Sequence, residues 1–242
     1  MKARLVFSLC VVCLALAARG QLFSDNFSRT TLPPWVAQSG TWVATGDVLR
    51  GVPNSAMTYG FAYITNNFTN FSVQAEFKFP TNAFGGGLGG RLNPTSGAHY
   101  AAWIYPENSA GGSNVVKLLR FDSYSSFVVL QQTNLSAVGT NVHTLKLEFS
   151  GSLINVYCDT SLVASAADST YGSGAISLDL WTHDAVYQMT VDNVVVSALP
   201  VLANDDSYSV VSGSVLSVAA PGVLANDAGG NGPLSAVLVD GT

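Results

Sequence analysis

The glycines of the stretch FGGGLGGR, residues 84–91, have the spacing of a phosphate-binding loop. Gly85, Gly87 and Gly90 match the G-x-G-x-x-G pattern. That pattern binds a dinucleotide only where a strand precedes it and a helix follows, because the N–H groups at the helix N-terminus hold the pyrophosphate. Here it is followed by LNPTSGAHYAAWIY, a proline-containing turn and then a strand-like alternation. The sequence therefore argues against nucleotide binding, and we expect these glycines to form a strand that a bulky neighbour or a ligand approaches closely.

Residues suited to acid–base catalysis are sparse. Glycoside hydrolysis needs two carboxyl groups about 5 to 9.5 Å apart, and Glu76, Glu107 and Glu148 are widely separated in the sequence. Asp179 and Asp184 form the nearest acidic pair in one strand region, but their spacing of five places them on opposite faces of a straight strand. Neither a G-x-S-x-G elbow nor an H-E-x-x-H motif is present. We therefore expect no catalytic residues.

Aromatic and charged residues recur along two predicted strands in a pattern that suits sugar binding. In HYAAWIY (99–105) and AISLDLW (175–181), alternate apolar residues are expected to face the core. The opposite face then carries planar rings, which stack on sugars, and polar groups, which bond to sugar hydroxyls. The residues predicted to bind a carbohydrate are Arg91, His99, Trp103, Tyr105, Asp179 and Trp181.

The strength and accessibility of this face are separate questions. One well-covered ring contributes roughly 1 to 2 kcal/mol, so binding is expected to be weak unless the module is repeated. The alternative is that Trp103 and Trp181 belong to the core, since a large aromatic residue in a strand is more often buried than exposed. Trp35 and Trp42 are predicted to be core residues.

Two aspartates near the ends of the alternating region suggest a metal site. Asp25 lies in the first predicted strand and Asp192 in the last, and an antiparallel fold of this kind brings those strands together. Calcium needs six to eight oxygen ligands, so backbone carbonyls and water would complete the shell. A structural calcium ion bound by Asp25 and Asp192 is one prediction, and ordinary solvent-facing acids are the alternative.

The elements that must position these residues are strands. In FSVQAEFKF, residues 71–79, apolar and polar residues alternate strictly, as in a half-buried strand. The same period returns through the region 22–198, with Gly, Asn, Pro and Ser at the breaks, and no segment there carries a 3.6-residue apolar stripe. This pattern predicts an all-β, antiparallel sandwich.

The N-terminal residues 1–20 have the pattern of a secretory signal peptide, with two basic residues, an apolar run and small residues before Gln21. A retained membrane anchor is the alternative. Without the three basic residues of this segment the formal net charge falls from −5 to −8, which disfavours nucleic acid as a partner. Cys158 is then the one remaining cysteine, so no intrachain disulfide is expected.

Residues 22–198 resemble the concanavalin A-like, laminin-G-like jelly-roll domains of secreted bacterial proteins. FSDNFSR (23–29), FSVQAEFKFP (71–80), GGGLGGRL (85–92) and YQMTVDNVVVS (187–197) carry the resemblance. It implies a jelly-roll sandwich. Hydrolytic members of that class carry an E-x-D-x-x-E strand, which this sequence lacks.

The last residues of the chain resemble a different module. ANDDSYSV and the following APGVLANDAGG resemble the first half of a bacterial cadherin-like or Ig-like surface repeat. The predicted organisation is a signal peptide (1–20), a jelly-roll domain (21–199), a linker (200–203) and a partial repeat (204–242).

Together these observations favour a secreted or cell-surface, non-catalytic module that recognises a polysaccharide or glycoconjugate and belongs to a larger adhesive protein. A jelly-roll glycoside hydrolase and a purely structural adhesive spacer are the two alternatives.

Overall fold

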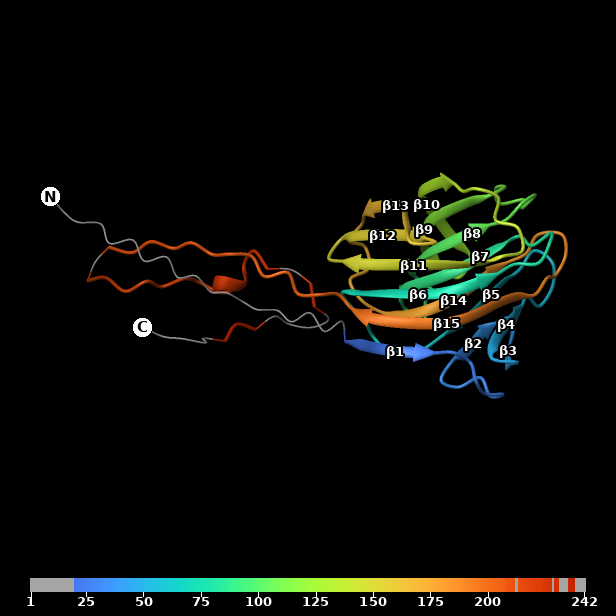
Figure 1. The fold of residues 1–242 in the computed structure, drawn as a ribbon, viewed down its shortest axis with the longest axis horizontal. Helices are drawn as coiled ribbons and strands as arrows, with labels where there is room; N and C mark the ends of the chain where they lie inside the picture. The colour runs from blue at the N-terminus through green and yellow to red at the C-terminus, as the bar shows by residue number, and fades with distance from the viewer. Residues whose placement is uncertain (1–19, 212, 228, 231–234, 238–242) are drawn as a thin grey trace.

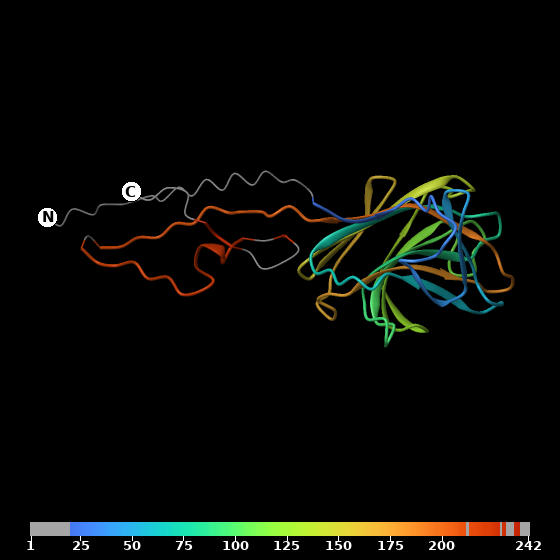
Figure 2. The ribbon, with the colours of Figure 1, turned by 90° about the horizontal axis from the view of Figure 1, so that it is seen from below.

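The protein folds as two antiparallel β-sheets stacked face to face, followed by an extended C-terminal segment (Figures 1 and 2). The computed structural model describes residues 20–211, 213–227, 229–230 and 235–237. The predicted signal peptide lies outside the described residues except for Gly20. Within the described part of the chain, no helix has the length and hydropathy needed to cross a bilayer.

Sheet A has eight strands in the order β13-β12-β11-β6-β15-β4-β3, with β1 paired to β15. Its strands are β1 (Gln21–Asp25), β3 (Thr41–Thr45), β4 (Val48–Val52), β6 (Phe71–Lys78), β11 (Val142–Ser150), β12 (Leu153–Cys158), β13 (Ser161–Ala167) and β15 (Met189–Ala198).

Sheet B has seven strands in the order β10-β9-β8-β7-β14-β5-β2. Its strands are β2 (Val36–Ser39), β5 (Tyr59–Tyr63), β7 (Gly85–Leu92), β8 (His99–Tyr105), β9 (Val115–Ser123), β10 (Ser126–Asn134) and β14 (Ala175–Trp181).

The alternating residues of sheet A build the core as predicted. In β6, Phe71, Val73, Ala75 and Phe77 are buried between the sheets, while the residues between them face outward. Removing such alternate apolar side chains from water gives about 25 cal/mol per Å² of buried apolar surface. The prediction of an all-β antiparallel sandwich is therefore confirmed, and Trp35 and Trp42 are core residues.

The glycine-rich strand β7 lies in the middle of sheet B, between β8 and β14. Neighbouring side chains fill the space that side chains on β7 would occupy. A Cβ on Gly90 would lie 2.4 Å from the Phe149 ring, which extends from β11 of sheet A across the core. Other groups therefore approach the β7 backbone closely, as the sequence predicted, and at Gly90 the approaching group is a side chain of the protein itself.

The first and last strands of the sandwich begin and end together. β1 runs antiparallel to β15, and the Ala198 N–H donates a 2.9 Å hydrogen bond to the Gly20 carbonyl. Beyond Ala198 the chain leaves the sandwich, and the short 3₁₀ helix η1 (Gly222–Leu224) is the regular element described there. The division into jelly roll, linker and partial repeat stays a prediction.

Candidate functional site

The outward face of sheet B carries an aromatic cluster separate from the core between the sheets. We call it the aromatic face; its members are Phe61, Ala101, Trp103, Tyr105, Val115, Leu119 and Phe121. Period-two alternation produces the aromatic face, because the residues next to its members along each strand, such as Ala102 and Ile104, point into the core. The predicted sidedness of HYAAWIY is therefore correct.

Asp179 of β14 lies within this cluster and is held by two side chains of β8. The Trp103 Nε1–H donates a 3.0 Å hydrogen bond to Asp179 Oδ2, and His99 Nε2 lies 3.2 Å from the same oxygen. His99 Nδ1 contacts the Gly97 carbonyl at 2.7 Å, and its ring stacks on Phe121 with centroids 4.5 Å apart. These four contacts hold Asp179, Trp103 and His99 in place, and we call this buried polar layer the floor of the aromatic face.

Two polar atoms of this floor have no hydrogen-bond partner within the described part of the chain. They are Asp179 Oδ1 and Ser177 Oγ, both buried. Leaving a buried polar group without a hydrogen-bond partner costs about 1 to 3 kcal/mol, so these two atoms lower the stability of this part of sheet B unless a partner binds them.

The expectation that the predicted sugar-binding residues face solvent is wrong for five of them. The exposed fractions are 1% for Trp103, 3% for Tyr105, 2% for Arg91 and 0% for His99 and Asp179. Rings from neighbouring strands and from the β9–β10 turn, including Phe61 and the partly exposed Tyr124, pack over the four that lie on the aromatic face. The alternative reading of Trp103 as a buried aromatic residue is correct, whereas Trp181 is partly exposed.

Arg91 lies away from the aromatic face, so its predicted place on that face is wrong. It lies at a bulge where β7 pairs with β14 and has a φ of 54°. Its guanidinium donates to the backbone carbonyls of Thr69 and Tyr171 and covers the Phe149 ring, with 5.0 Å from Cζ to the centroid. Burial lowers the pKa of Arg91, and the side chain joins loops at one end of the sandwich.

The accessible rings of the aromatic face include Tyr59, Tyr124 and Trp181, which are partly exposed and pack against its buried members. Tyr59 pairs with Trp181 across the β5–β14 ladder, and its ring centroid lies 6.1 Å from that of Trp103. Sequence reasoning missed Tyr59 and Tyr124. The alternation of YGFAY, residues 59–63, would have placed Tyr59 beside Phe61.

Lys117 of β9 is also on this face and was not predicted. Its Nζ lies 4.7 Å from the centroid of the Tyr105 ring and donates a 2.6 Å hydrogen bond to the Gly111 carbonyl. Burial lowers the pKa of Lys117 and raises the pKa of Tyr105. A cation, exposed rings and a buried polar floor thus occur together on one side of sheet B.

The residues predicted to bind calcium do not fit that ion. Both oxygens of Asp25 accept from the Arg29 guanidinium at 2.5 Å, and they also accept from the Phe27 N–H and the Trp35 Nε1–H. A carboxylate has about four lone-pair sites, so none remains for a metal. Burial alone would raise the pKa of Asp25, but the Arg29, Phe27 and Trp35 hydrogen bonds lower it.

Asp192 is near the same place, in β15, and accepts a 2.7 Å hydrogen bond from the Asn193 N–H. Burial raises its pKa, and the nearby acidic groups Glu76, Asp47 and Asp25 raise it further. Asp25 is bonded to Arg29, and Asp192 and its acidic neighbours do not form a group whose ligand atoms all lie within 4.8 Å of one another in the described part of the chain, so no set of carboxylates is gathered to supply the roughly six to eight oxygens that calcium needs.

One other group of metal-ligand types occurs in the described part of the chain: His143, Cys158 and Asp159, whose ligand atoms all lie within 4.8 Å of one another. Both nitrogens of His143 are already used, because Nδ1 lies 2.7 Å from Asp159 Oδ2 and Nε2 lies 2.8 Å from the Val138 carbonyl. Burial raises the pKa of the Cys158 thiol to about 12. The hydrogen bonds of His143 and the raised pKa of Cys158 therefore make this group a poor metal site.

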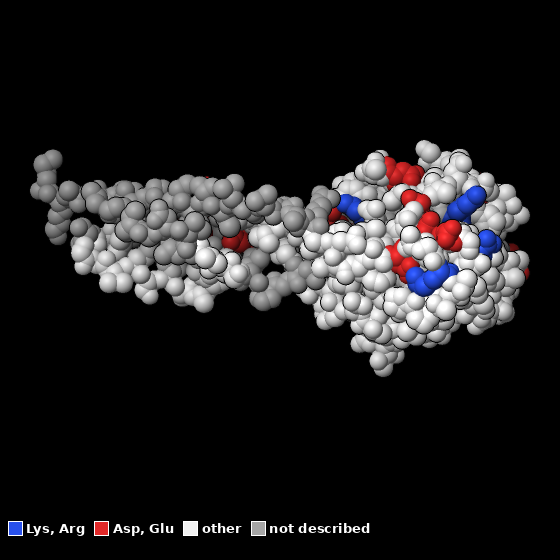
Figure 3. All heavy atoms as spheres, turned by 60° about the horizontal axis from the view of Figure 1, so that its bottom comes forward, with Lys and Arg blue, Asp and Glu red and all other residues white. Residues whose placement is uncertain are grey.

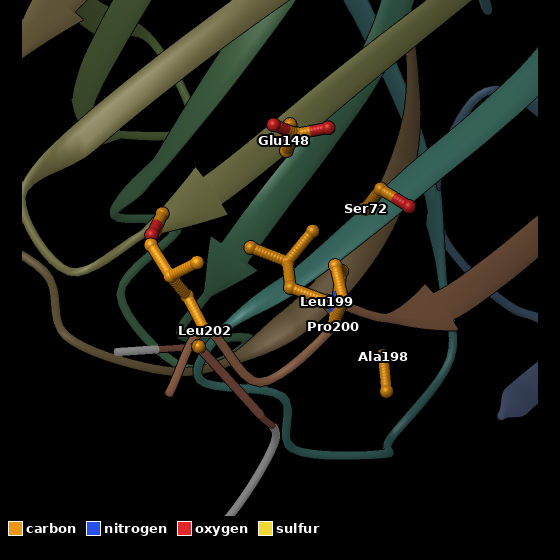
Figure 4. A pocket seen from close by; sticks show the side chains of 8 residues that line it. Ser72, Glu148, Ala198, Leu199, Pro200 and Leu202 are labelled. Carbon is orange, nitrogen blue, oxygen red and sulfur yellow. The ribbon is translucent and has the colours of Figure 1, made fainter. Parts of the chain in front are cut away.

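Acidic and basic side chains are interspersed on the part of the surface that Figure 3 shows, so that view presents no field of a single sign. A hollow of about 250 Å³ lies where the C-terminal segment leaves the sandwich (Figure 4). Ser72 and Glu148 face it from β6 and β11, and Leu199, Pro200 and Leu202 form its apolar side. It has no aromatic ring in its lining, unlike the aromatic face.

The comparisons with known proteins agree with this fold. No protein family was found to match the sequence. The levanase of Bacillus subtilis (strain 168) is 25% identical over 154 residues, which are 64% of this chain and 22% of the levanase.

Solved structures share the architecture at low sequence identity. The carbohydrate-binding module CBM66 from Bacillus subtilis superimposes with a TM-score of 0.58 at 22% identity, covering 70% of this chain and 97% of the module. The β-glucanase of Bacillus licheniformis superimposes with a TM-score of 0.56 at 13% identity, covering 73% of this chain and 98% of the enzyme. The chain therefore has a concanavalin-like β-sandwich jelly-roll fold, which it shares with a binding module and with a glycoside hydrolase.

Proposed function

We propose that this protein is a secreted, non-catalytic module that binds a polysaccharide or glycoconjugate on the aromatic face of sheet B. The observation that carries the proposal is the pair of cross-strand rings, Tyr59 and Trp181, which lie partly exposed over a buried aromatic layer. The names of the levanase and of CBM66 support a carbohydrate as the partner.

The physical basis is ring stacking on a rigid support. Tyr59 and Trp181 stand on adjacent strands, so their positions are fixed by the ladder that joins β5 and β14. Trp103 and Phe121 pack under Tyr59, with ring centroids 6.1 and 6.5 Å away. A support of this kind lets each ring meet the apolar face of a sugar with little loss of side-chain entropy.

A catalytic role is not supported by the carboxyl group of this face. Asp179 has no exposed surface, and its described partners are Trp103 and His99 instead of a second carboxyl group. Hydrolysis of a glycosidic bond needs an acid that reaches the leaving oxygen and a second carboxylate at the opposite side of the bond.

Affinity electrophoresis of the full chain through gels containing levan, β-glucan or polygalacturonate tests the proposal. Tyr59→Leu and Trp181→Leu replace the ring by a smaller apolar side chain, and each is expected to weaken binding about 5- to 30-fold, the equivalent of roughly 1 to 2 kcal/mol. Tyr157→Leu is the matched control, because Tyr157 is a partly exposed tyrosine of sheet A.

Retardation that is lost in the two sheet B variants and kept in the control supports the proposal. Retardation lost only in Tyr157→Leu would move the site to sheet A, and no retardation by any of the three polysaccharides would refute carbohydrate binding as proposed. Thermal melts of each variant show that the fold is retained.

A further inference from the structure

Lys117 is a partly buried cation on the aromatic face whose strand neighbours carry no negative charge. It is opposite Trp103 on β8 and opposite Gln132 on β10. Its ammonium group lies over the Tyr105 ring and donates to the Gly111 carbonyl. An ammonium group has three N–H donors, and the hydrogen bond to Gly111 uses one of them.

A second lysine of this protein provides the comparison. Lys146 lies over the Tyr157 ring of sheet A at 4.1 Å, in the same type of contact, but its Nζ also forms a 3.1 Å ion pair with Glu148. Among the ion pairs of the residues that the structure describes, none involves Lys117. Two lysines with the same aromatic support thus differ in whether a carboxylate balances the charge.

The unbalanced charge has a physical cost that a ligand would offset. Burial without an anion nearby disfavours the charged form, and burial lowers the pKa of Lys117 accordingly. An anionic ligand group would take the free N–H donors, and such charge-assisted hydrogen bonds are about twice as strong as neutral ones.

We propose that Lys117 binds the anionic group, a carboxylate or a sulfate, of an acidic sugar whose ring stacks on the exposed aromatic residues beside it. This inference rests on the proposed function, because it names the class of sugar that the same face takes. Lys117 forms a cation–π contact with Tyr105, whose ring lies 6.4 Å from that of Trp181, so a charge and a stacking surface adjoin. The protein's formal charge of −5 opposes long-range attraction of an acidic polymer, so recognition depends on this local contact.

Isothermal titration of the full chain with oligogalacturonate, sulfated carrageenan oligosaccharides, levan oligosaccharides and β-glucan oligosaccharides tests the inference. The wild type is expected to bind an acidic ligand, and Lys117→Met to bind it at least roughly tenfold more weakly. Lys117→Arg keeps the charge and is expected to retain most of the affinity. Lys146→Met is the matched control and is expected to leave binding unchanged.

The outcomes separate this inference from the proposed function. Binding to oligogalacturonate identifies a carboxylate ligand and binding to carrageenan a sulfate ligand, and either supports the inference when Lys117→Met weakens it. Binding of the neutral oligosaccharides alone, with Lys117→Met unchanged, would overturn the inference and leave the proposed function intact. Binding of none of the four ligands would overturn both. A melting temperature for Lys117→Met close to that of the wild type shows that loss of binding is not loss of fold.

Discussion

Replacing Trp103 by phenylalanine removes one hydrogen bond from the buried Asp179 and tests whether that contact stabilises sheet B. The Trp103 Nε1–H lies 3.0 Å from Asp179 Oδ2, and the Asp179 carboxyl group has no exposed surface. Asp179 Oδ1 already lacks a partner among the described residues, so the variant leaves His99 as the described hydrogen-bond partner of the carboxyl group. Leaving such an acceptor short of donors costs about 1 to 3 kcal/mol.

Two other buried tryptophans provide matched controls for the loss of the indole. Trp42 donates to the Ser39 backbone carbonyl at 2.9 Å, a neutral acceptor, so the hydrogen bond lost in Trp42→Phe is expected to cost about 1 kcal/mol in addition to the lost ring volume. Trp35 donates to Asp25 at 2.8 Å, but Asp25 keeps its bonds from Arg29 and Phe27, so Trp35→Phe is expected to cost a similar amount. The loss of ring volume is the same in all three variants.

Guanidinium denaturation followed by circular dichroism gives the free energy of unfolding for each variant, and a thermal scan with the same signal gives its melting temperature. For a domain of this size, 1 kcal/mol corresponds to about 2 to 4 °C in melting temperature. Trp103→Phe should therefore melt at a temperature up to about 10 °C below that of the wild type and below both controls. Equal destabilisation of Trp103→Phe and Trp42→Phe would refute the argument that the Asp179 contact stabilises more than an ordinary tryptophan hydrogen bond does.

Two further variants test other parts of the structure. Burial lowers the pKa of His143, but the Val138 carbonyl and Asp159 raise it more, so it lies above the ordinary value and its stabilising effect is lost as pH rises through the folded pKa. His143→Gln should therefore destabilise the protein more at about pH 5.5 than at about pH 9 in urea titrations, and a constant difference would contradict this. Gly90→Ala forces a Cβ against Phe149 and should cost about 1 to 3 kcal/mol, whereas Gly172→Ala, with open space around it, should melt like the wild type.

The side to which each strand residue points could be predicted because alternation is a local property. The alternation within each strand alone predicts that Trp103 and Asp179 lie on one face, and that prediction is correct. Whether a face is open depends on residues that cover it from elsewhere. Phe61 and Phe121 belong to β5 and β9, and nothing in HYAAWIY indicates that they pack over it.

Local exceptions to the period explain the other errors. Arg91 has a positive φ at a bulge of β7, which breaks the alternation and turns its side chain to the end of the sandwich. The occupied oxygens of Asp25 result from Arg29, four residues along the chain, which folds back onto it. The alternation of apolar and polar residues predicts neither the contacts of Arg91 nor those of Asp25.

The hydrogen bond between Ala198 and Gly20 has a mechanical consequence. The first residue of β1 and the last residue of β15 are neighbours, so a force applied to the two ends of the sandwich pulls these strands apart from that end. The hydrogen bonds between β1 and β15 then break one after another from that end. In a shear geometry all of these bonds would instead carry the force at the same time. Under tension the jelly roll should peel from this seam, and β1 should detach while the aromatic strands of sheet B are still paired.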